Sequence, residues 1–168
     1  SNTQLAGQIN GNANMAGGSA KVILNEVRSS DPSQLNGMVE VAGQSAQVII
    51  ANPSGITCDG CGFINTNHAT LTTGTATYDN KGNVSGLDVS KGQVTITGKG
   101  MDTRSTQYTD IIARSVKVNA KLQANELNIV TGNNHIDKYG RVQKKYDSSN
   151  APDVALDVSA LGSMYANK

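Results

Sequence analysis

The chain has 168 residues, a length that suits one domain with a substantial core. Its net charge is +1 and charged residues make up 16% of it, so it lacks the basic surface expected of a nucleic-acid-binding protein. No run approaches the roughly 18 apolar residues of a transmembrane helix, and we expect no stable insertion into a membrane.

The core must be built from small aliphatic side chains. Aromatic residues are 4% of the chain, with one Phe and no Trp. This composition suits a stack of narrow rungs better than an ordinary two-layer domain. The 18 glycines, together with many asparagines, tolerate the positive φ angles that frequent tight turns require.

In the first half of the chain, short apolar runs between turn residues predict strands. Residues 1–18 are polar and rich in Gly and Asn, which predicts loops with one short strand. Turns are expected at residues 29–32 and 80–83. The predicted strands are residues 20–27, 38–41, 48–50 and 70–77, with another beginning at Phe63.

The second half shows a regular spacing of alternating strands. Val94 and Ile96 point to one side of a predicted strand, and two further pairs repeat the pattern. Val116 follows Val94 by 22 residues, and Leu127 follows Val116 by 11. Such spacing is typical of a solenoid whose turns each contain two or three short strands. The tail, residues 136–168, loses this spacing, and we expect a short strand or irregular cap there.

Two all-β architectures fit these strands, a parallel β-helix and an antiparallel sandwich. A sandwich needs tight hairpin turns, and Asn36-Gly37 and Asp59-Gly60 are sequences that could supply them. The best candidate for a helix, residues 110–118, is rich in β-branched residues and favours a strand instead. The repeat spacing favours the solenoid.

Residues 52–55, with the sequence Asn-Pro-Ser-Gly, suit a type I turn between two strands. Asn52 can bond the backbone ahead of it, Pro53 presets φ at the second position, and Gly55 is tolerated at the fourth. The chain then resumes as a strand at Ile56. The turn therefore fixes the direction in which the chain re-enters the stack.

Cys58 and Cys61 flank Asp59-Gly60 directly after this turn. A structural disulfide or a pair of thiols is the favoured interpretation. A zinc site would need four ligands, and the two histidines lie at unsuitable spacings. A redox motif should open a helix, which the glycines and strand-forming residues that follow disfavour.

The remaining polar residues suggest no catalytic site and no metal site. His68 and His135 are interpreted as isolated loop residues, and the aspartates as turn residues. Two facing carboxylates, which a glycosidase needs, are not indicated. Five threonines are expected to form a solvent-exposed row, and an alternative role for them is pairing with another chain: Thr70, Thr72, Thr73, Thr75 and Thr77.

Residues 46–66 resemble the two-partner-secretion (TPS) domain, the N-terminal module of large bacterial exoproteins such as filamentous haemagglutinins, contact-dependent growth-inhibition toxins and Serratia/Proteus-type haemolysins. One family motif is matched at Asn52, Pro53, Gly55 and Ile56, and this chain has Ser54 where the motif has Asn. The Cys pair matches one branch of the family. A second family motif, Asn-Pro-Asn-Leu, is degenerate here. It corresponds to Asn12, Ala13, Asn14 and Met15.

The resemblance implies a right-handed parallel β-helix with irregular or short antiparallel capping elements, formed by residues 1–168 as one domain. No signal peptide is visible at Ser1, and we expect the chain to be a fragment of a much larger exoprotein. The domain would be recognised by the periplasmic domains of a dedicated outer-membrane transporter. It would then nucleate β-helix folding at the surface of a Gram-negative bacterium or in the medium.

This implied function is not enzymatic and needs no cofactor. The alternatives are a structural adhesin or fibre segment, which pairs with cell surfaces or other β-helix chains, and a carbohydrate-active β-helix enzyme. Residues 52–56 are expected to matter most for export. Replacing Asn52 removes one local hydrogen bond, at roughly 1 kcal/mol, and on this basis should reduce secretion while leaving the fold intact.

Overall fold

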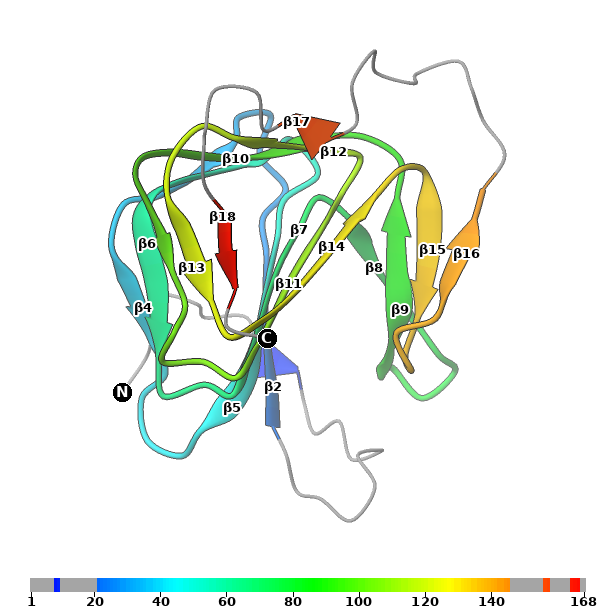
Figure 1. Cartoon of the computed structure of the whole chain (residues 1–168). Coiled ribbons are helices and arrows are strands. Elements are labelled where there is room, and N and C mark those ends of the chain that lie inside the picture. Colours follow the sequence, from blue (N-terminus) through cyan, green and yellow to red (C-terminus); the bar gives the residue numbers. More distant parts are fainter. Residues whose placement is uncertain (1–7, 10–20, 146–155, 158–163, 167–168) are drawn as a thin grey trace.

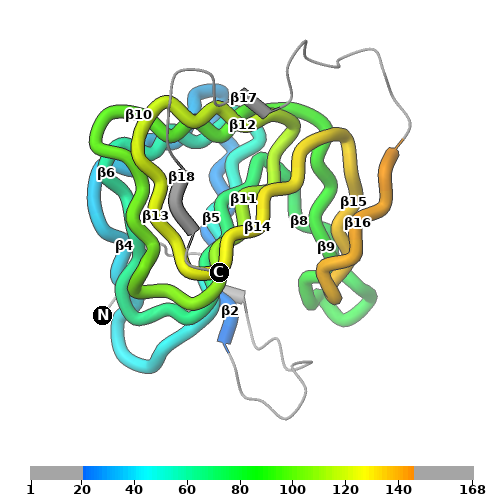
Figure 2. Tube along the Cα trace, in the orientation of Figure 1, coloured from blue at the N-terminus to red at the C-terminus, as the bar shows by residue number. Residues whose placement is uncertain are grey.

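The computed structural model describes residues 8–9, 21–145, 156–157 and 164–166, and these residues form strands and the segments that connect them. The strands wind into a coil in which successive turns add strands to three faces (Figure 1, Figure 2). The described residues contain no helix that could span a membrane. This architecture confirms the prediction of an all-β, right-handed parallel β-helix over the antiparallel sandwich.

The first face is a sheet of five parallel strands with one short antiparallel strand at its edge. In spatial order these strands are β1 (Gln8–Ile9), β2 (Lys21–Glu26), β5 (Ala46–Ala51), β7 (His68–Thr72), β11 (Tyr108–Ala113) and β14 (Glu126–Thr131). We number the turns of the coil as rungs 1 to 5, which begin at β2, β5, β7, β11 and β14.

The second and third faces share two long strands that bend at the corner between them, β6 (Ile56–Ile64) and β10 (Gln93–Asp102). The second face is completed by β3 (Ser33–Leu35), β12 (Ser115–Val118) and β17 (Leu156–Asp157). The third face is completed by β4 (Met38–Glu40), β13 (Leu122–Ala124) and β18 (Met164–Ala166).

The strand register explains the spacing in the sequence. Val94 lies beside Ile56 on one neighbouring strand and beside Val116 on the other. The interval of 22 residues is therefore one complete rung. Leu127 lies on β14 in the first face, so the 11-residue step leads from one face of the coil to another.

The interior of the coil is filled by stacked aliphatic side chains, as the composition predicts. Val94, Ile96, Val116 and Val118 are fully buried, and so is Phe63, the one Phe of the chain. The β14 residues Leu127 and Ile129 are half-buried and pack against this core at its last rung. Parallel stacking places apolar residues in rows along the axis, so a narrow core suffices.

A separate antiparallel sheet lies against the outer side of the first face (Figure 1). Its strands are β8 (Thr75–Tyr78), β9 (Val84–Val89), β15 (Asn134–Asp137) and β16 (Val142–Lys144). The hairpin β8–β9 leaves the coil at the first corner, between the first and second faces, in rung 3. The hairpin β15–β16 leaves it at the same corner in rung 5. Short antiparallel elements were predicted as caps, but these hairpins cover a flank.

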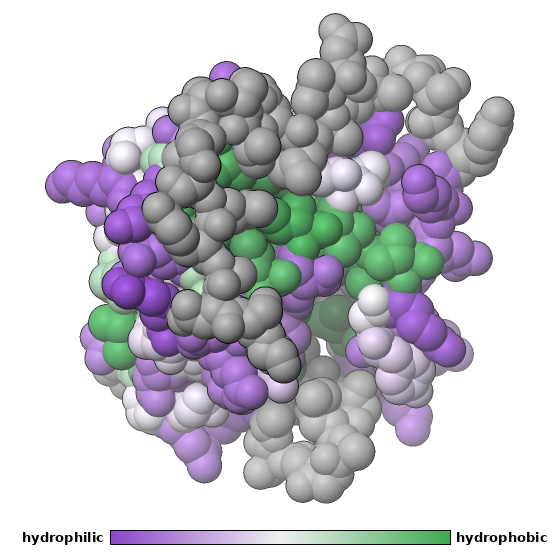
Figure 3. All heavy atoms as spheres, in the orientation of Figure 1, coloured by the Kyte–Doolittle hydropathy of each residue, from purple (hydrophilic) through white to green (hydrophobic). Residues whose placement is uncertain are grey.

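A second apolar core fills the space between this sheet and the coil. Leu87, Val89 and Ile136 come from the antiparallel sheet and pack with Ile49 and Ile112 of the first face. Figure 3 shows hydrophobic side chains gathered between the two parts on the face in view. The first face is therefore apolar on its inner side and on part of its outer side.

The predicted exposed row of threonines is wrong for three of its five members. Thr70, Thr72 and Thr73 are at most 3% exposed, because the antiparallel sheet covers this part of the first face. The hydroxyl of Thr72 accepts a hydrogen bond from the amide of Gly74, 2.9 Å away. The run 70–77 also forms two strands, because the chain leaves the coil after β7.

Each of the two hairpins has its own turn, and both turns are built in the same way around an aspartate. In β8–β9, the Oδ1 atom of Asp79 accepts hydrogen bonds from the amides of Lys81 and Asn83, at 2.8 and 3.0 Å. In β15–β16, Asp137 accepts the equivalent bonds from the amides of Tyr139 and Arg141, at 2.8 and 2.9 Å. Both turns depend on a carboxylate that accepts two backbone amides.

These turns are expected to loosen in acid. The amide of Asn83 lowers the pKa of Asp79 below its ordinary value of 3.8, and the amide of Arg141 lowers that of Asp137. A lowered pKa in the folded state contributes stability above pH 3.8 that is lost as the pH falls through the folded value. NMR should show the amide of Asn83 titrating below pH 3.8, and Asp79→Asn should abolish that step alone. A midpoint above 3.8 would contradict this.

Candidate functional site

The turn at residues 52–55 lies at the first corner of rung 2. It is closed by a hydrogen bond from the amide of Gly55 to the carbonyl of Asn52, at 2.9 Å. The Oδ1 atom of Asn52 also accepts a bond from the amide of Ser54, at 2.9 Å. The β-turn expected from the sequence is therefore present, and it carries an Asx bond as well.

The Asn52 side chain also ties rung 2 to rung 1. Its Nδ2 donates to the carbonyl of Asp31, at 3.0 Å, and to the hydroxyl of Ser33, at 2.9 Å. The hydroxyl of Ser54 donates to the carbonyl of Ser29, at 2.6 Å. Asn52 is 0% exposed, and its side-chain amide bonds three polar groups that are themselves partly accessible. Sequence reasoning missed its rung 1 partners, because residues about 20 positions apart meet only once the coil is formed.

Rung 3 holds the turn from the other side. The backbone amide of Asn52 donates a hydrogen bond to the carbonyl of Thr72, at 3.0 Å. Gly55 has φ +121°, and a Cβ there would lie 3.0 Å from the carbonyl oxygen of Gln93. Ile56, fully buried, pairs with Val94 on the same side. The turn is thus held between two corners, which leaves only Pro53 and Ser54 partly accessible.

Cys58 and Cys61 flank the second corner of rung 2, between the second and third faces. Their sulfur atoms are bonded, their Cα atoms are 5.4 Å apart, and both residues are buried. The Oδ1 atom of Asp59, between them, accepts a hydrogen bond from the amide of Lys99 in rung 3, at 2.8 Å. The disulfide therefore closes a corner that is also bonded to the next rung.

The chain is expected to yield free thiols only after reduction. Alkylation of the denatured protein followed by mass spectrometry should label no cysteine without reductant and both with it, since the chain has no others. Reduction should lower the free energy of unfolding by about 2 kcal/mol, because so short a loop limits the unfolded chain only modestly. Labelling without reductant would contradict the disulfide.

The other residues singled out in the sequence lie elsewhere. The degenerate motif Asn12, Ala13, Asn14 and Met15 falls outside the described residues. The histidines were placed in loops, and this is wrong, since both lie on strands beside an aspartate. The Nε2 atom of His68 lies 2.5 Å from Asp110, and the Nδ1 atom of His135 lies 2.7 Å from Asp88.

The acidic residues do not gather into a metal site in the part of the chain that the structure describes, where no group of three His, Cys, Asp or Glu could hold an ion. The turn and the corner that follows it are bonded to the rungs on both sides. Their chemistry is structural, because their polar groups are engaged with one another. What remains accessible is a small surface formed by the turn, next to the corner from which the hairpins leave.

Comparison with known proteins gives consistent results. The sequence model of the TPS secretion domain matches residues 4–168. The chain is 57% identical to a protein named Toxin CdiA from Yersinia pestis and 50% identical to a Toxin CdiA from Escherichia coli, over 99% of the chain in both alignments. It spans about 5% of the length of these relatives. The crystal structure of a filamentous hemagglutinin secretion domain matches with a TM-score of 0.75 and 34% identity, over 86% of this chain and 51% of that one.

Proposed function

Because the chain belongs to the family of TPS secretion domains, we propose that residues 1–168 form one module that directs a much larger bacterial protein out of the cell. The observation that carries this proposal is the match of that family over residues 4–168. The partner would be an outer-membrane transporter of a Gram-negative bacterium, which engages the chain in the periplasm. The module itself performs no catalysis in this proposal.

The larger protein would be a toxin of the CdiA kind. The identity of 57% over 99% of the chain supports this choice over a haemolysin or a general adhesin. The chain covers only about a twentieth of that relative, so the proposal assigns the toxic activity to sequence outside these 168 residues.

The fold supports a second part of this role, in which the module templates further β-helix. Among the described strands, β14 has a neighbour on one side only, β11. Its Leu127 and Ile129 already continue the interior rows of the coil. A strand that follows in the exported protein could pair with the free edge of β14 and bury these side chains further.

The proposed role can be tested with a reporter. The chain, placed between a periplasmic signal sequence and a reporter enzyme, should deliver the reporter to the medium only when the cognate transporter is co-expressed. The reporter without the chain serves as the control and should stay in the periplasm. Retention of the fusion in the periplasm beside a functional transporter would overturn the proposal, and binding of the purified chain to cells without export would favour the adhesin.

A further inference from the structure

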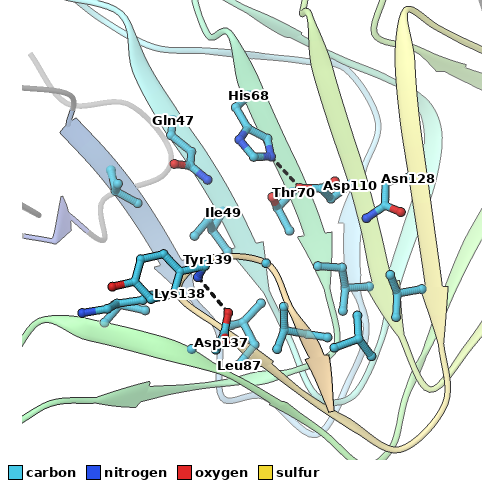
Figure 4. Close-up of a pocket in the computed structure, with 18 residues that line it drawn as sticks. Gln47, Ile49, His68, Thr70, Leu87, Asp110, Asn128, Asp137, Lys138 and Tyr139 are labelled. Carbon is cyan, nitrogen blue, oxygen red and sulfur yellow. Dashed lines mark hydrogen bonds and ion pairs between the residues drawn. The ribbon is translucent and has the colours of Figure 1, made fainter. Parts of the chain in front are cut away.

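A cavity of about 450 Å³ lies between the outer side of the first face and the antiparallel sheet (Figure 4). One wall carries polar side chains on neighbouring strands of the coil. We call these residues the polar ladder: Gln47, His68, Thr70, Asp110 and Asn128. The floor is aliphatic and includes Ile49, Leu87 and Ile112. Lys138 and Tyr139, from the β15–β16 turn, form the opposite rim.

The ladder follows the rungs of the coil. Thr70 on β7 lies beside Asp110 on β11, which lies beside Asn128 on β14. Strands in a sheet repeat every ~4.8 Å, so Thr70, Asp110 and Asn128 offer one polar side chain on each of three successive strands, and Ile49 continues the row on β5. This step is close to the advance per residue of an extended β-linked glycan. Figure 4 shows these side chains pointing into the same space.

The ladder also offers both hydrogen-bond donors and hydrogen-bond acceptors, which the hydroxyl groups of a sugar require. The side-chain amides of Gln47 and Asn128 can donate and accept, and neither has a hydrogen-bond partner among the described residues. Asp110 accepts, and it is held by His68 at 2.5 Å and by the hydroxyl of Thr70 at 3.4 Å. The aliphatic floor suits the apolar face of a sugar ring, and the exposed ring of Tyr139, over which Lys138 and Arg141 lie at 5.4 and 5.1 Å, adds apolar surface at the rim.

Other ligand classes fit this cavity less well. The ladder lies on the face of a sheet whose backbone groups pair in the plane of the sheet, so an extended peptide lying across this face would find no backbone groups to pair with. The carboxylate of Asp110 disfavours an anionic polymer. We propose that the cavity binds a neutral, extended β-1,4-linked oligosaccharide. This inference does not depend on the export role, because it concerns the folded chain alone.

The site should bind the glycan without cleaving it. Glycoside hydrolysis needs two carboxyl groups that face the scissile bond. Besides Asp110, the cavity is lined by one other carboxylate, Asp137. That group is engaged by the amides of Tyr139 and Arg141 and by the guanidinium of Arg141, at 2.7 to 2.9 Å. It is therefore part of the hairpin turn rather than a second catalytic acid.

Binding can be measured by NMR titration of the folded 168-residue chain. Chitotetraose and cellotetraose, both β-1,4-linked, should shift the amides of β7, β11 and the β15–β16 turn saturably at millimolar concentrations. Maltotetraose, whose α-linked chain is not extended, and tetra-alanine should not. Absence of saturation with both β-linked probes, or equal binding of tetra-alanine, would overturn the proposal.

Substitutions locate the site. Gln47→Leu and Asn128→Leu each remove a side-chain amide that lines the cavity and is at least partly exposed. Each is expected to weaken binding of the β-linked probe by about two- to tenfold, the range for loss of one neutral hydrogen bond. Gln34→Leu, on the outer side of the second face, is the matched control and should leave binding unchanged. Unchanged binding in both ladder variants would also overturn the proposal.

Discussion

Replacing Asn52 with alanine is expected to lower the free energy of unfolding by about 3 kcal/mol. The substitution leaves three groups at a part-buried corner without their partner: the carbonyl of Asp31, the hydroxyl of Ser33 and the backbone amide of Ser54. The sequence-based expectation of roughly 1 kcal/mol counted only the bond inside the turn. The two bonds to rung 1 raise the expected cost above that of the one hydrogen bond that the sequence indicates.

Urea denaturation measures this change directly, as a lower midpoint with an unchanged slope. Ser54→Ala is the control. It removes the exposed hydrogen bond from Ser54 to the carbonyl of Ser29, and should lower the free energy of unfolding by less than about 1 kcal/mol. Asn52→Asp keeps the acceptor for Ser54 but loses both donated bonds, and should be at least as destabilising as alanine. Equal stability of Asn52→Ala and the native chain would contradict the structural role.

Export through the transporter should separate a structural role of this turn from a role in direct contact with the transporter. Asn52 is 0% exposed, so a partner that meets the folded turn can touch only its neighbours Pro53 and Ser54. We expect Asn52→Ala to reduce export in proportion to the loss of folded protein. Full export of this destabilised variant would show that the transporter does not need the folded turn.

Replacing Gly100 with alanine is expected to cost about 4 kcal/mol, the largest effect of a single methyl group that we anticipate. Gly100 has φ +82°, and a Cβ there would lie 2.1 Å from the carbonyl oxygen of Lys121 in rung 4. That oxygen also accepts a hydrogen bond from the amide of Met101, at 2.9 Å. Relieving the clash would separate two rungs at the second corner.

Gly82→Ala provides a matched control for this prediction. Gly82 has nearly the same φ, +83°, but a Cβ there would meet no atom within 4 Å. It therefore carries only the backbone strain, about 1 kcal/mol. Thermal or urea unfolding of the two variants should differ by about 3 kcal/mol, which isolates the steric effect. Equal losses in both would show that the rungs can separate at little cost.

The sequence predicts the coil because its information is local. Val94, Ile96, Val116 and Val118 alternate within short strands, and strands stacked in register bury identical positions. The turn at residues 52–55 is also readable, since Asn, Pro and Gly have conformational preferences that act within four residues. Both features depend on neighbours in sequence.

The antiparallel sheet could not be predicted in this way. The hairpins β8–β9 and β15–β16 enter at one corner of the coil but are separated by rung 4, and they meet only after that rung has formed. Whether Thr70 or Thr72 is buried depends on this sheet, which packs on the outside of strands that would otherwise face water. The pairing of His68 with Asp110 is likewise decided by the register of β7 against β11.

The small size of the disulfide loop has a consequence for passage through a narrow channel. Cys58 and Cys61 are separated by three positions, and the bond holds their Cα atoms 5.4 Å apart where an extended chain would span about 10 Å. An unfolded, oxidised chain is thus shortened by only about 5 Å and carries no large covalent ring. It can be threaded as a nearly linear polymer, so oxidation before translocation would require no reducing step on the way out.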